Sequence, residues 1–303
     1  MNTAISTEEG EFGERLVLHQ EWKDEYIGYM QDHKISELNV NYARGFKGDT
    51  LDFLQDLPFL TGLLLIVYNI PDTSVIHNLR RLRALNIGTR DTTHLDFTQF
   101  PLLEDCFMNW RTKSESIFHC TALKRLHIDK YSGKNTDGFG SLSALKELYF
   151  SGGPVADLTG LIPLQGLEKL GLYHLRSLSS LQGIQSLMRL EELKIETCRK
   201  INQIDEVQDL KNLRRLTIAN CGDIASLRPI DGLSRLERLY FYESTNILDG
   251  DLSSLTRLKN LSDVRFKNRK HYSEKCEDYP PFNTDSRLRG KALIEALQKG
   301  LPL

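Results

Sequence analysis

The sequence lacks a long hydrophobic run and a surplus of one charge, and each shortage excludes a class of protein. No segment approaches the ~20 apolar residues that a membrane-spanning helix requires, and the longest candidate, residues 60–70, contains Gly62, Tyr68 and Asn69. The net charge is −2, so no general electric field favours nucleic acid or an anionic membrane. We therefore expect a soluble protein without a membrane partner.

Cysteine is also scarce, and so are the signatures of export. The five cysteines are an odd number without the regular spacing of a disulfide framework, which favours a reducing compartment. Residues 1–11 are acidic and contain no apolar segment, which argues against a cleaved signal peptide. Together these features predict a cytoplasmic location.

The usual sequence signatures of catalysis are missing as well. The chain has no Gly-rich phosphate loop, no H-E-x-x-H, no G-x-S-x-G and no paired C-x-x-C, so we expect no enzyme, no cofactor and no metal site. The fragment Cys276-Glu-Asp278 is the one catalytic candidate. Its structural alternative is a solvent-facing loop, because Pro280 and Pro281 follow directly.

What the sequence does contain is a repeat. A strand-like apolar pattern, as in Leu145-Lys-Glu-Leu148-Tyr-Phe150, recurs eleven times at spacings of 20 to 25 residues. The repeats begin at Ile35, Leu60, Leu82, Leu103, Leu123, Leu145, Leu167, Leu190, Leu213, Leu236 and Leu261. This period and the L-x-x-L-x-L core are typical of the leucine-rich repeat. The fold class is therefore α/β: a leucine-rich-repeat solenoid (horseshoe) with a parallel concave sheet.

The segments between the strands predict short turns on the convex side. Leucines spaced by three, as in residues 158–167 and 227–236, fit 3₁₀ turns better than a long α-helix. Pro163 and Pro229 lie inside these segments, where a continuous α-helix would lose a hydrogen bond. Cys198 and Cys221 hold the same place in consecutive repeats, and we interpret them as buried corner residues that donate weakly to backbone carbonyls.

The solenoid needs caps, because terminal repeats would otherwise expose apolar flanks. We expect one domain in three parts: an N-terminal cap over residues 1–34, about eleven repeats over residues 35–268, and a C-terminal cap over residues 269–303. The first cap should contain a helix with Trp22, Tyr26 and Met30 on its apolar side. The second should contain a helix from about Thr284 to Lys299. Helical caps are thus predicted at both ends.

Alternation along each strand places the third, fifth and seventh residues of every repeat on the concave face. The fifth and seventh positions combine aromatic and charged residues, a composition enriched at protein-recognition hot spots. The predicted partner-binding residues are Phe107, Asn109, His127, Asp129, Tyr149, Tyr173, Lys194, Glu196, Tyr240, Tyr242, Arg265 and Lys267. The alternative is that strands simply favour Tyr and Phe.

Two segments carry a family resemblance. Val155-Ala-Asp-Leu158-Thr-Gly-Leu161-Ile-Pro-Leu164 and Ile224-Ala-Ser-Leu227-Arg-Pro-Ile230-Asp-Gly-Leu233 resemble the strand exit and 3₁₀ return of bacterial internalin-type leucine-rich-repeat proteins. The resemblance covers about residues 35–268 and departs from surface internalins in lacking a signal sequence and a wall anchor. It implies a bacterial binding protein without an anchor.

These observations predict a non-catalytic module that binds another protein, such as a toxin or a signalling enzyme, through its concave face. An immunity or antitoxin-type inhibitor is the specific form we expect. One alternative is an injected effector, because Cys276-Glu-Asp278 resembles the C-x-D motif of bacterial ubiquitin ligases that carry leucine-rich repeats. The other is a nucleic-acid-binding scaffold that uses the basic end formed by Arg265, Lys267, Arg269 and Lys270.

Overall fold

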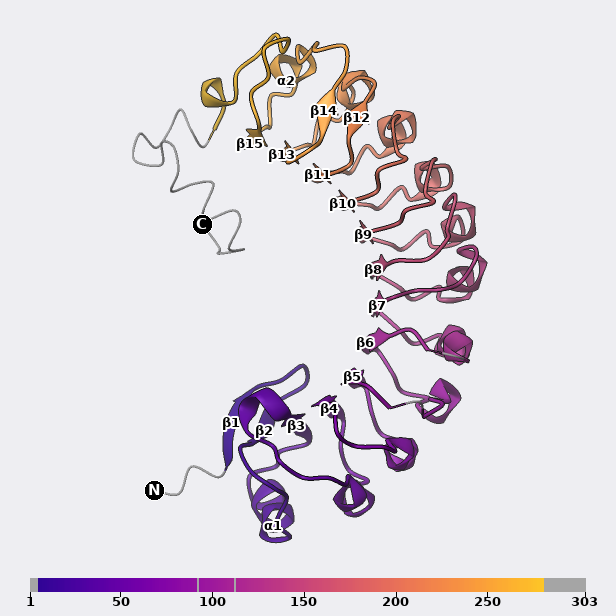
Figure 1. Cartoon of the computed structure of the whole chain (residues 1–303), viewed down its shortest axis with the longest axis vertical. Helices are drawn as coiled ribbons and strands as arrows, with labels where there is room; N and C mark the ends of the chain where they lie inside the picture. The colour runs from indigo at the N-terminus through magenta and orange to yellow at the C-terminus, as the bar shows by residue number, and fades with distance from the viewer. Residues whose placement is uncertain (1–4, 92, 112, 281–303) are drawn as a thin grey trace. The chain divides into compact units, whose positions relative to one another are not determined.

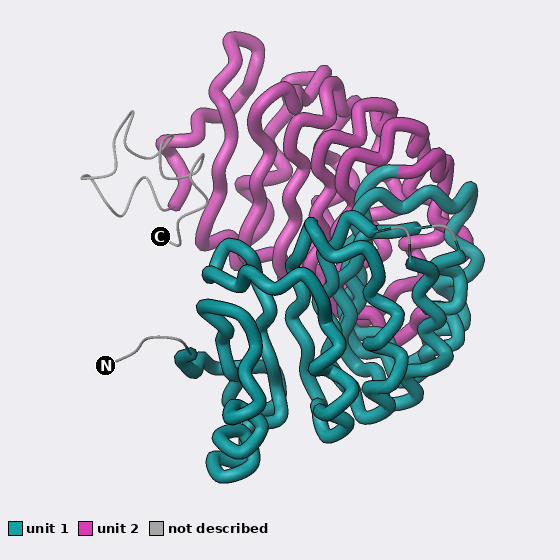
Figure 2. Tube along the Cα trace, turned by 60° about the horizontal axis from the view of Figure 1, so that its bottom comes forward, with its two compact units in different colours: residues 1–152 teal, residues 153–303 magenta. Residues whose placement is uncertain are grey.

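The computed structural model describes residues 5–91, 93–111 and 113–280. The chain divides into two compact units, residues 1–152 and residues 153–303 (Figure 2). In each unit, strands lie side by side along one edge of the repeats and short return turns lie along the other (Figure 1). The fold class predicted from the repeats, a leucine-rich-repeat solenoid with a parallel sheet and short 3₁₀ turns, is confirmed.

Unit 1 begins with a β-hairpin and a helix and continues with repeats. Its strands are β1 (Ile5–Glu9), β2 (Glu14–Leu18), β3 (Glu37–Asn41), β4 (Gly62–Val67), β5 (Ala84–Thr89), β6 (Asp105–Asn109), β7 (Arg125–Asp129) and β8 (Glu147–Ser151). Its helices are α1 (Glu25–Asp32) and the 3₁₀ turns η1 (Tyr42–Arg44), η2 (Asp52–Asp56), η3 (Ser74–Asn78), η4 (Phe97–Gln99), η5 (Ser114–His119) and η6 (Asp137–Ser141). Strands β2 to β8 pair in parallel, and β1 pairs antiparallel with β2.

Unit 2 repeats the same plan. Its strands are β9 (Lys169–Tyr173), β10 (Glu192–Glu196), β11 (Arg215–Ala219), β12 (Asp223–Ile224), β13 (Arg238–Tyr242), β14 (Asn246–Ile247) and β15 (Asp263–Phe266). Its helices are η7 (Thr159–Leu161), η8 (Ile184–Ser186), η9 (Asp205–Asp209), η10 (Arg228–Ile230), α2 (Ser254–Arg257) and η11 (Cys276–Asp278). Strands β9, β10, β11, β13 and β15 pair in parallel, and β12 and β14 form a separate two-stranded sheet.

The eleven repeat strands each begin two residues after the repeat start predicted from the sequence. Side-chain alternation follows the predicted pattern: in β8, Leu148 and Phe150 are fully buried while Tyr149 between them is half-buried. In unit 2, Leu170, Leu193 and Leu216 lie in register on neighbouring strands, all at zero exposure. Burying such a leucine contributes about 1.5–3 kcal/mol, so the stacked leucines hold neighbouring repeats together.

The residue after each of several strands turns the chain with a left-handed backbone. Lys130, His174, Thr197, Asn220 and Glu243 all have φ between 52° and 60°. L-residues other than Asn and Asp rarely adopt this region. The corner is therefore set by the geometry of the repeat and not by one residue type.

The two corner cysteines are buried as predicted. The Cys198 thiol lies 3.6 Å from the Leu172 carbonyl oxygen, and the Cys221 thiol lies 3.4 Å from that of Ile195. Burial, the larger cause, raises the pKa of Cys198 to about 12 and that of Cys221 to about 11. Both thiols thus act as small apolar groups with weak hydrogen bonds.

The irregular repeats of unit 1 contain a buried ionic network. The Asp91 carboxylate has zero exposure and lies 3.2 Å from the Arg111 guanidinium. It also accepts hydrogen bonds from the Thr89 and Thr73 hydroxyls and from the Thr93 backbone N–H. A buried charge is tolerated when it is paired and hydrogen-bonded in this way, so this network fixes the loops where the leucine pattern is weakest.

At the N-terminal side, β2 and α1 lie where the first cap is predicted, and β1 adds a strand that the sequence did not reveal. The C-terminal helix predicted over residues 284–299 lies outside the described residues. Among the described residues, no helix has both the length and the apolar character needed to cross a membrane.

Candidate functional site: the open face of the sheet

We use "open face" for the side of each sheet that points away from the core, which is the predicted concave face. In unit 1 the open face holds a row of rings in the fifth position. Phe107, His127 and Tyr149 are in register on β6, β7 and β8. The ring centroids of Phe107 and His127 are 4.3 Å apart, and those of His127 and Tyr149 are 5.9 Å apart. All three side chains are half-buried, so the structure brings these predicted residues together.

The seventh position of the same strands is polar. Asn109 and Asp129 are paired in register on β6 and β7. The Asp129 carboxylate lies 3.6 Å from the His127 imidazole, but burial is the larger effect and lowers the pKa of His127. The lowered pKa favours the neutral form of His127, whose ring provides a polar aromatic surface. Among the described residues, no group of three His, Cys, Asp or Glu could hold a metal ion.

The loop of the N-terminal hairpin reaches this sheet. The Glu37 carboxylate on β3 is fully buried, binds the Arg15 guanidinium at 2.9 Å, and accepts the backbone N–H groups of Glu11 and Phe12. From this fixed point, Glu11 forms an ion pair with Arg125 on β7. The Phe12 ring lies 3.8 Å from the Arg83 guanidinium. The loop thus contacts the side of the sheet where β5 and β7 begin.

Sequence reasoning missed an apolar patch in unit 1. Tyr42 and Tyr68 are 51% and 37% exposed, and their ring centroids are 4.5 Å apart. The Arg90 guanidinium lies 4.4 Å from the centre of the Tyr68 ring. Leu64 and Ile66, on the strand β4 that leads to Tyr68, are half-buried on the open face. The repeat itself contained the signal, because Leu64 and Ile66 hold the fifth and seventh positions.

In unit 2 the predicted residues fall into two registers. In the seventh position, Tyr173 lies beside Glu196, and Tyr242 follows beyond the short side chain of Ala219. In the fifth position, Tyr240 lies beside Arg265. Neighbouring strands are about 4.8 Å apart, so Tyr173 and Tyr240 are separated by β10 and β11 and do not touch.

Arg265 is less accessible than a contact residue would be. Its guanidinium binds both oxygens of Asp263, at 2.8 and 2.9 Å, and lies 5.0 Å from the centre of the Tyr240 ring. The side chain is 11% exposed. Lys267, just beyond β15, is exposed.

The pairing of Arg265 and Arg269 reduces the number of free cations at the predicted basic end. Arg265 is neutralised by Asp263, and the Arg269 guanidinium donates to the backbone carbonyls of Glu243 and Thr245. Lys267 and Lys270 are the exposed cations of this end. Two lysines do not make the extended cationic track that binds a phosphate backbone.

A hollow of about 290 Å³ lies on the open face of unit 2. Its lining comes from three neighbouring strands: Glu192, Lys194, Arg215, Leu216, Thr217, Arg238 and Tyr240. Lys194 and Tyr240 were predicted as partner-binding residues, whereas Arg215 and Arg238 hold the third position of their repeats and were not among the predicted residues. Arg215 does pair with Glu192, at 2.7 Å.

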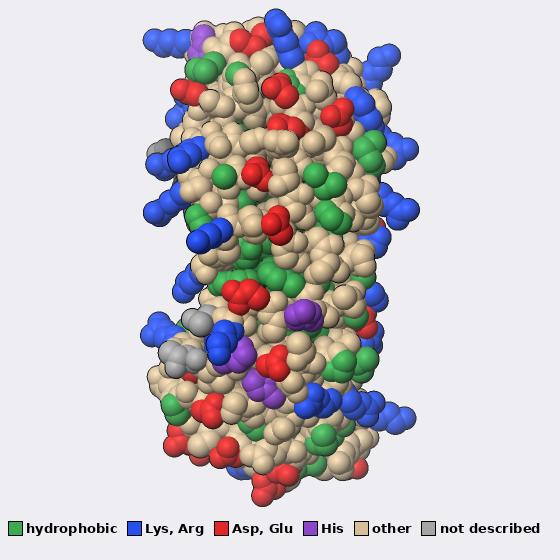
Figure 3. Space-filling view, turned by 90° about the vertical axis from the view of Figure 1, so that its right-hand side faces the viewer, with side chains coloured by type: hydrophobic (Ala, Val, Ile, Leu, Met, Phe, Trp, Pro, Cys, Tyr) green, Lys and Arg blue, Asp and Glu red, His purple; other side chains and the backbone are tan. Residues whose placement is uncertain are grey.

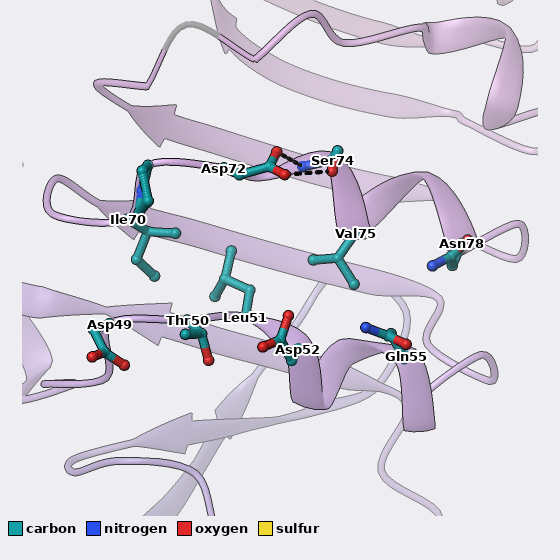
Figure 4. Close-up of a pocket in the computed structure, with 11 residues that line it drawn as sticks. Asp49, Thr50, Leu51, Asp52, Gln55, Ile70, Asp72, Ser74, Val75 and Asn78 are labelled. Carbon is teal, nitrogen blue, oxygen red and sulfur yellow. Dashed lines mark hydrogen bonds between the residues drawn. The ribbon is translucent and has the colours of Figure 1, made fainter.

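A second hollow, of about 470 Å³, lies between two loops of unit 1 on the side of the return turns. Figure 4 shows Leu51, Ile70 and Val75 directed into the gap and Asp72 hydrogen-bonded to Ser74. Asp72 also accepts a hydrogen bond from the Thr93 hydroxyl in the loop of the next repeat, so both of its carboxylate oxygens are occupied. Figure 3 shows the side of the return turns, where acidic and basic side chains are interspersed.

The prediction that the fragment faces solvent is wrong for Cys276, although Glu277 and Asp278 beside it are exposed. The Cys276 side chain is 4% exposed, and its sulfur lies 3.3 Å from the backbone N–H of Phe266, which donates to it. Burial is the largest effect and raises the pKa of the thiol to about 11. Reactive cysteines are accessible and have a lowered pKa, so this geometry does not favour a Cys276 nucleophile. The turn η11 packs against β15, which explains the burial.

Solved structures with a similar fold include an internalin and a receptor. An internalin of Listeria monocytogenes is 20% identical, with 85% of this chain and 83% of that chain covered and a TM-score of 0.59. A structure described as a TDR receptor is 17% identical, with 81% of this chain and 46% of that chain covered and the same TM-score of 0.59. At these identities the likeness shows the fold. The internalin-like leucine-rich-repeat fold that the resemblance implied is thus confirmed.

The chain matches no protein-family model and no curated protein.

Proposed function

We propose that the protein is a non-catalytic module that binds another protein through the open face of its sheet. The observation that carries the proposal is the alternation of core-facing and outward-facing side chains along each strand. The core-facing residues of β8 are fully buried, while Tyr149 between them stays half-buried on the open face. Tyr173, Tyr240 and Tyr242 are placed in the same way in unit 2. Partly exposed tyrosines on a rigid scaffold are well suited to be hot spots.

The charges on the open face also favour a protein partner. In unit 1 the third, fifth and seventh positions carry one arginine, Arg125, and three carboxylates besides the buried Glu37: Asp105, Asp129 and Glu147. In unit 2 they carry six cations and three carboxylates: Lys169, Lys194, Arg215, Arg238, Arg265, Lys267, Glu192, Glu196 and Asp263. Mixed charge of this kind gives specificity through complementary potentials.

Within this class, the specific form we propose is an immunity or antitoxin-type protein that blocks a bacterial toxin in the cytoplasm. A stoichiometric inhibitor needs a binding surface and no catalytic centre. The cytoplasmic location is supported by the five cysteines, which are all free and buried. A natural first partner to test is the protein encoded by the neighbouring gene.

The test is to isolate the partner from the source cell and measure its affinity for two variants, Tyr149→Ala and Tyr240→Ala. Removal of a hot-spot aromatic costs ~2 kcal/mol or more, which is about 30-fold in affinity. The matched control is Met188→Ala, because Met188 is 49% exposed on a return turn. Full affinity of both tyrosine variants, or an equal loss in the control, would refute binding through the open face.

A further inference from the structure

The hollow of unit 2 exists because β11 has short side chains between longer ones. In the fifth position, Thr217 lies between Lys194 on β10 and Tyr240 on β13. In the seventh position, Ala219 lies between Glu196 and Tyr242. β11 therefore forms the floor of a furrow, and the neighbouring strands form its walls.

The hollow is positively charged. Three cations and one carboxylate line it. Glu192 binds Lys194 at 2.8 Å and Arg215 at 2.7 Å, one on each carboxylate oxygen. Burial opposes the ionisation of Glu192, but the hydrogen bonds and charges of these two cations outweigh burial and lower its pKa. Glu192 thus pairs with Lys194 and Arg215 but not with Arg238, the third cation of the lining.

Arg238 has no acidic partner within residues 5–280 that the structure describes. Its register neighbour on β15 is Asp263, and the Asp263 carboxylate is already bound by the Arg265 guanidinium and by the Tyr240 hydroxyl. Arg238 is exposed, so its five N–H donors face the hollow and solvent. The Thr217 hydroxyl on the floor likewise makes no hydrogen bond to the described part of the chain.

We infer that this hollow binds the carboxylate of an aspartate or glutamate in an acidic segment of the partner protein, with Arg238 as the anchor. This inference rests on the proposed function and names the chemistry of the partner. The planar guanidinium of Arg238 binds a carboxylate through two parallel N–H donors, and the Thr217 hydroxyl supplies a third donor. The volume fits a side chain and is below the range of cofactor sites.

The surroundings of the hollow favour a protein segment over a nucleic acid. Glu192, Glu196 and Asp263 lie on the same open face, and their charges repel a continuous phosphate backbone. The rings of Tyr240 and Tyr242 beside the cations provide apolar surface for the rest of a peptide. An isolated carboxylate on a partly apolar segment meets both conditions.

The experiment is a selection of a random peptide library on the full chain and on two variants. Arg238→Glu reverses the charge of the proposed anchor. Lys211→Glu makes the same change of charge at an exposed lysine just after the return turn η9. Peptides enriched on the natural chain and on Lys211→Glu should share an acidic residue at a fixed position. On Arg238→Glu that residue should be lost, and the original peptides should bind about 30-fold more weakly or worse.

Several results would overturn the inference. Peptides without a fixed acidic residue, or with one that persists on Arg238→Glu, would refute the role of Arg238 as the anchor. The open-face proposal would still stand if Tyr240→Ala abolished the binding of these peptides. A phosphoserine peptide that binds many-fold more tightly than its glutamate counterpart would assign the hollow to phosphate. A single-stranded oligonucleotide that competes with the peptides, with steep salt dependence, would assign it to nucleic acid. Because Arg238 is exposed, its variant should unfold at the same temperature as the natural chain.

Discussion

Arg238 and Asp263 lie side by side in the register of β13 and β15, yet the Asp263 carboxylate binds Arg265 and the Tyr240 hydroxyl, and Arg238 has no acidic partner in the described part of the chain. The Tyr240 hydroxyl donates this hydrogen bond. Burial first, and then the hydrogen bond to Asp263, raise the pKa of Tyr240 to about 12. The phenol therefore remains a donor throughout the neutral range.

Tyr240→Phe should lower the free energy of unfolding by roughly 1.5–3 kcal/mol, because it removes one hydrogen bond to a charged acceptor. The matched control is Tyr242→Phe, whose hydroxyl makes no hydrogen bond within the described residues; it should cost less than about 0.5 kcal/mol. Urea unfolding of both variants measures the difference. Equal costs would show that the Tyr240–Asp263 hydrogen bond does not stabilise the fold.

Arg111→Ala should be among the most destabilising single changes in unit 1. It leaves the fully buried Asp91 carboxylate without its cation, and breaking a buried pair costs roughly 3–5 kcal/mol. The comparison is Arg214→Ala, which breaks a surface pair with Glu237 and should shift the urea midpoint far less, because solvent screens an exposed pair. Urea midpoints that shift equally in both variants would contradict the role of the network.

Stability should fall in acid partly through Asp91. Burial acts to raise the pKa of Asp91, but hydrogen bonds from Thr89 and Thr93 and the charge of Arg111 outweigh it, so the pKa is lowered in the folded state. The stability that Asp91 contributes is fully present above its unfolded pKa, about 3.9, and is lost as the pH falls through the folded pKa. Asp91→Asn should therefore be less stable than the natural chain at pH 6, with a smaller loss on going to pH 3. Parallel pH curves for the two proteins would refute this assignment.

All five thiols should be unreactive in the folded protein, because every cysteine is buried. The pKa of Cys276, about 11, means that only about one molecule in ten thousand carries the thiolate at pH 7. Labelling with a thiol reagent should be slow and should accelerate in urea along with unfolding. Rapid, selective modification of Cys276 in the folded state would instead revive the enzyme hypothesis.

Thr197 offers a stabilising change. Its φ of 58° is left-handed, a region that costs a β-branched residue roughly 1–2 kcal/mol and that Asn tolerates, as at Asn220 in the next repeat. Thr197→Asn should raise the midpoint of thermal unfolding by a few degrees. The reverse change, Asn220→Thr, should lower it, and shifts of the opposite sign would show that the corner is unstrained.

The repeat strands and the 3₁₀ returns could be predicted from the sequence because leucine spacing reports directly on which side chains are buried. The position of every repeat strand followed from the first apolar residue of each repeat. The two cysteine corners were predictable for the same reason, since Cys198 and Cys221 recur at one place in consecutive repeats.

Other features depend on contacts between residues far apart in the sequence. Strand β1 has polar residues on both sides and shows no burial pattern, so it is recognised only by its pairing with β2. The burial of Cys276 depends on η11 folding back onto β15, which no spacing encodes. Arginine is a residue type common in binding sites, but the Arg265 guanidinium is paired with Asp263 and its side chain is 11% exposed.

The hollow of unit 2 was missed for a different reason. The aromatic and charged side chains of the fifth position indicated Lys194 and Tyr240. The space itself is created by Thr217, the short residue between them, which has neither property. A prediction of a binding surface from a repeat must therefore follow the small side chains as well as the large ones.

Thr217 and Ala219 lie on the open side of β11 at 8% and 4% exposure, whereas the fully buried Leu216 and Ile218 hold the stack, so the shape of this furrow depends on two side chains outside the leucine core. A single substitution in that strand could make room for a larger acidic group or close the furrow altogether. Related chains with the same leucine core could thus differ in the segments that they bind through changes at these two positions.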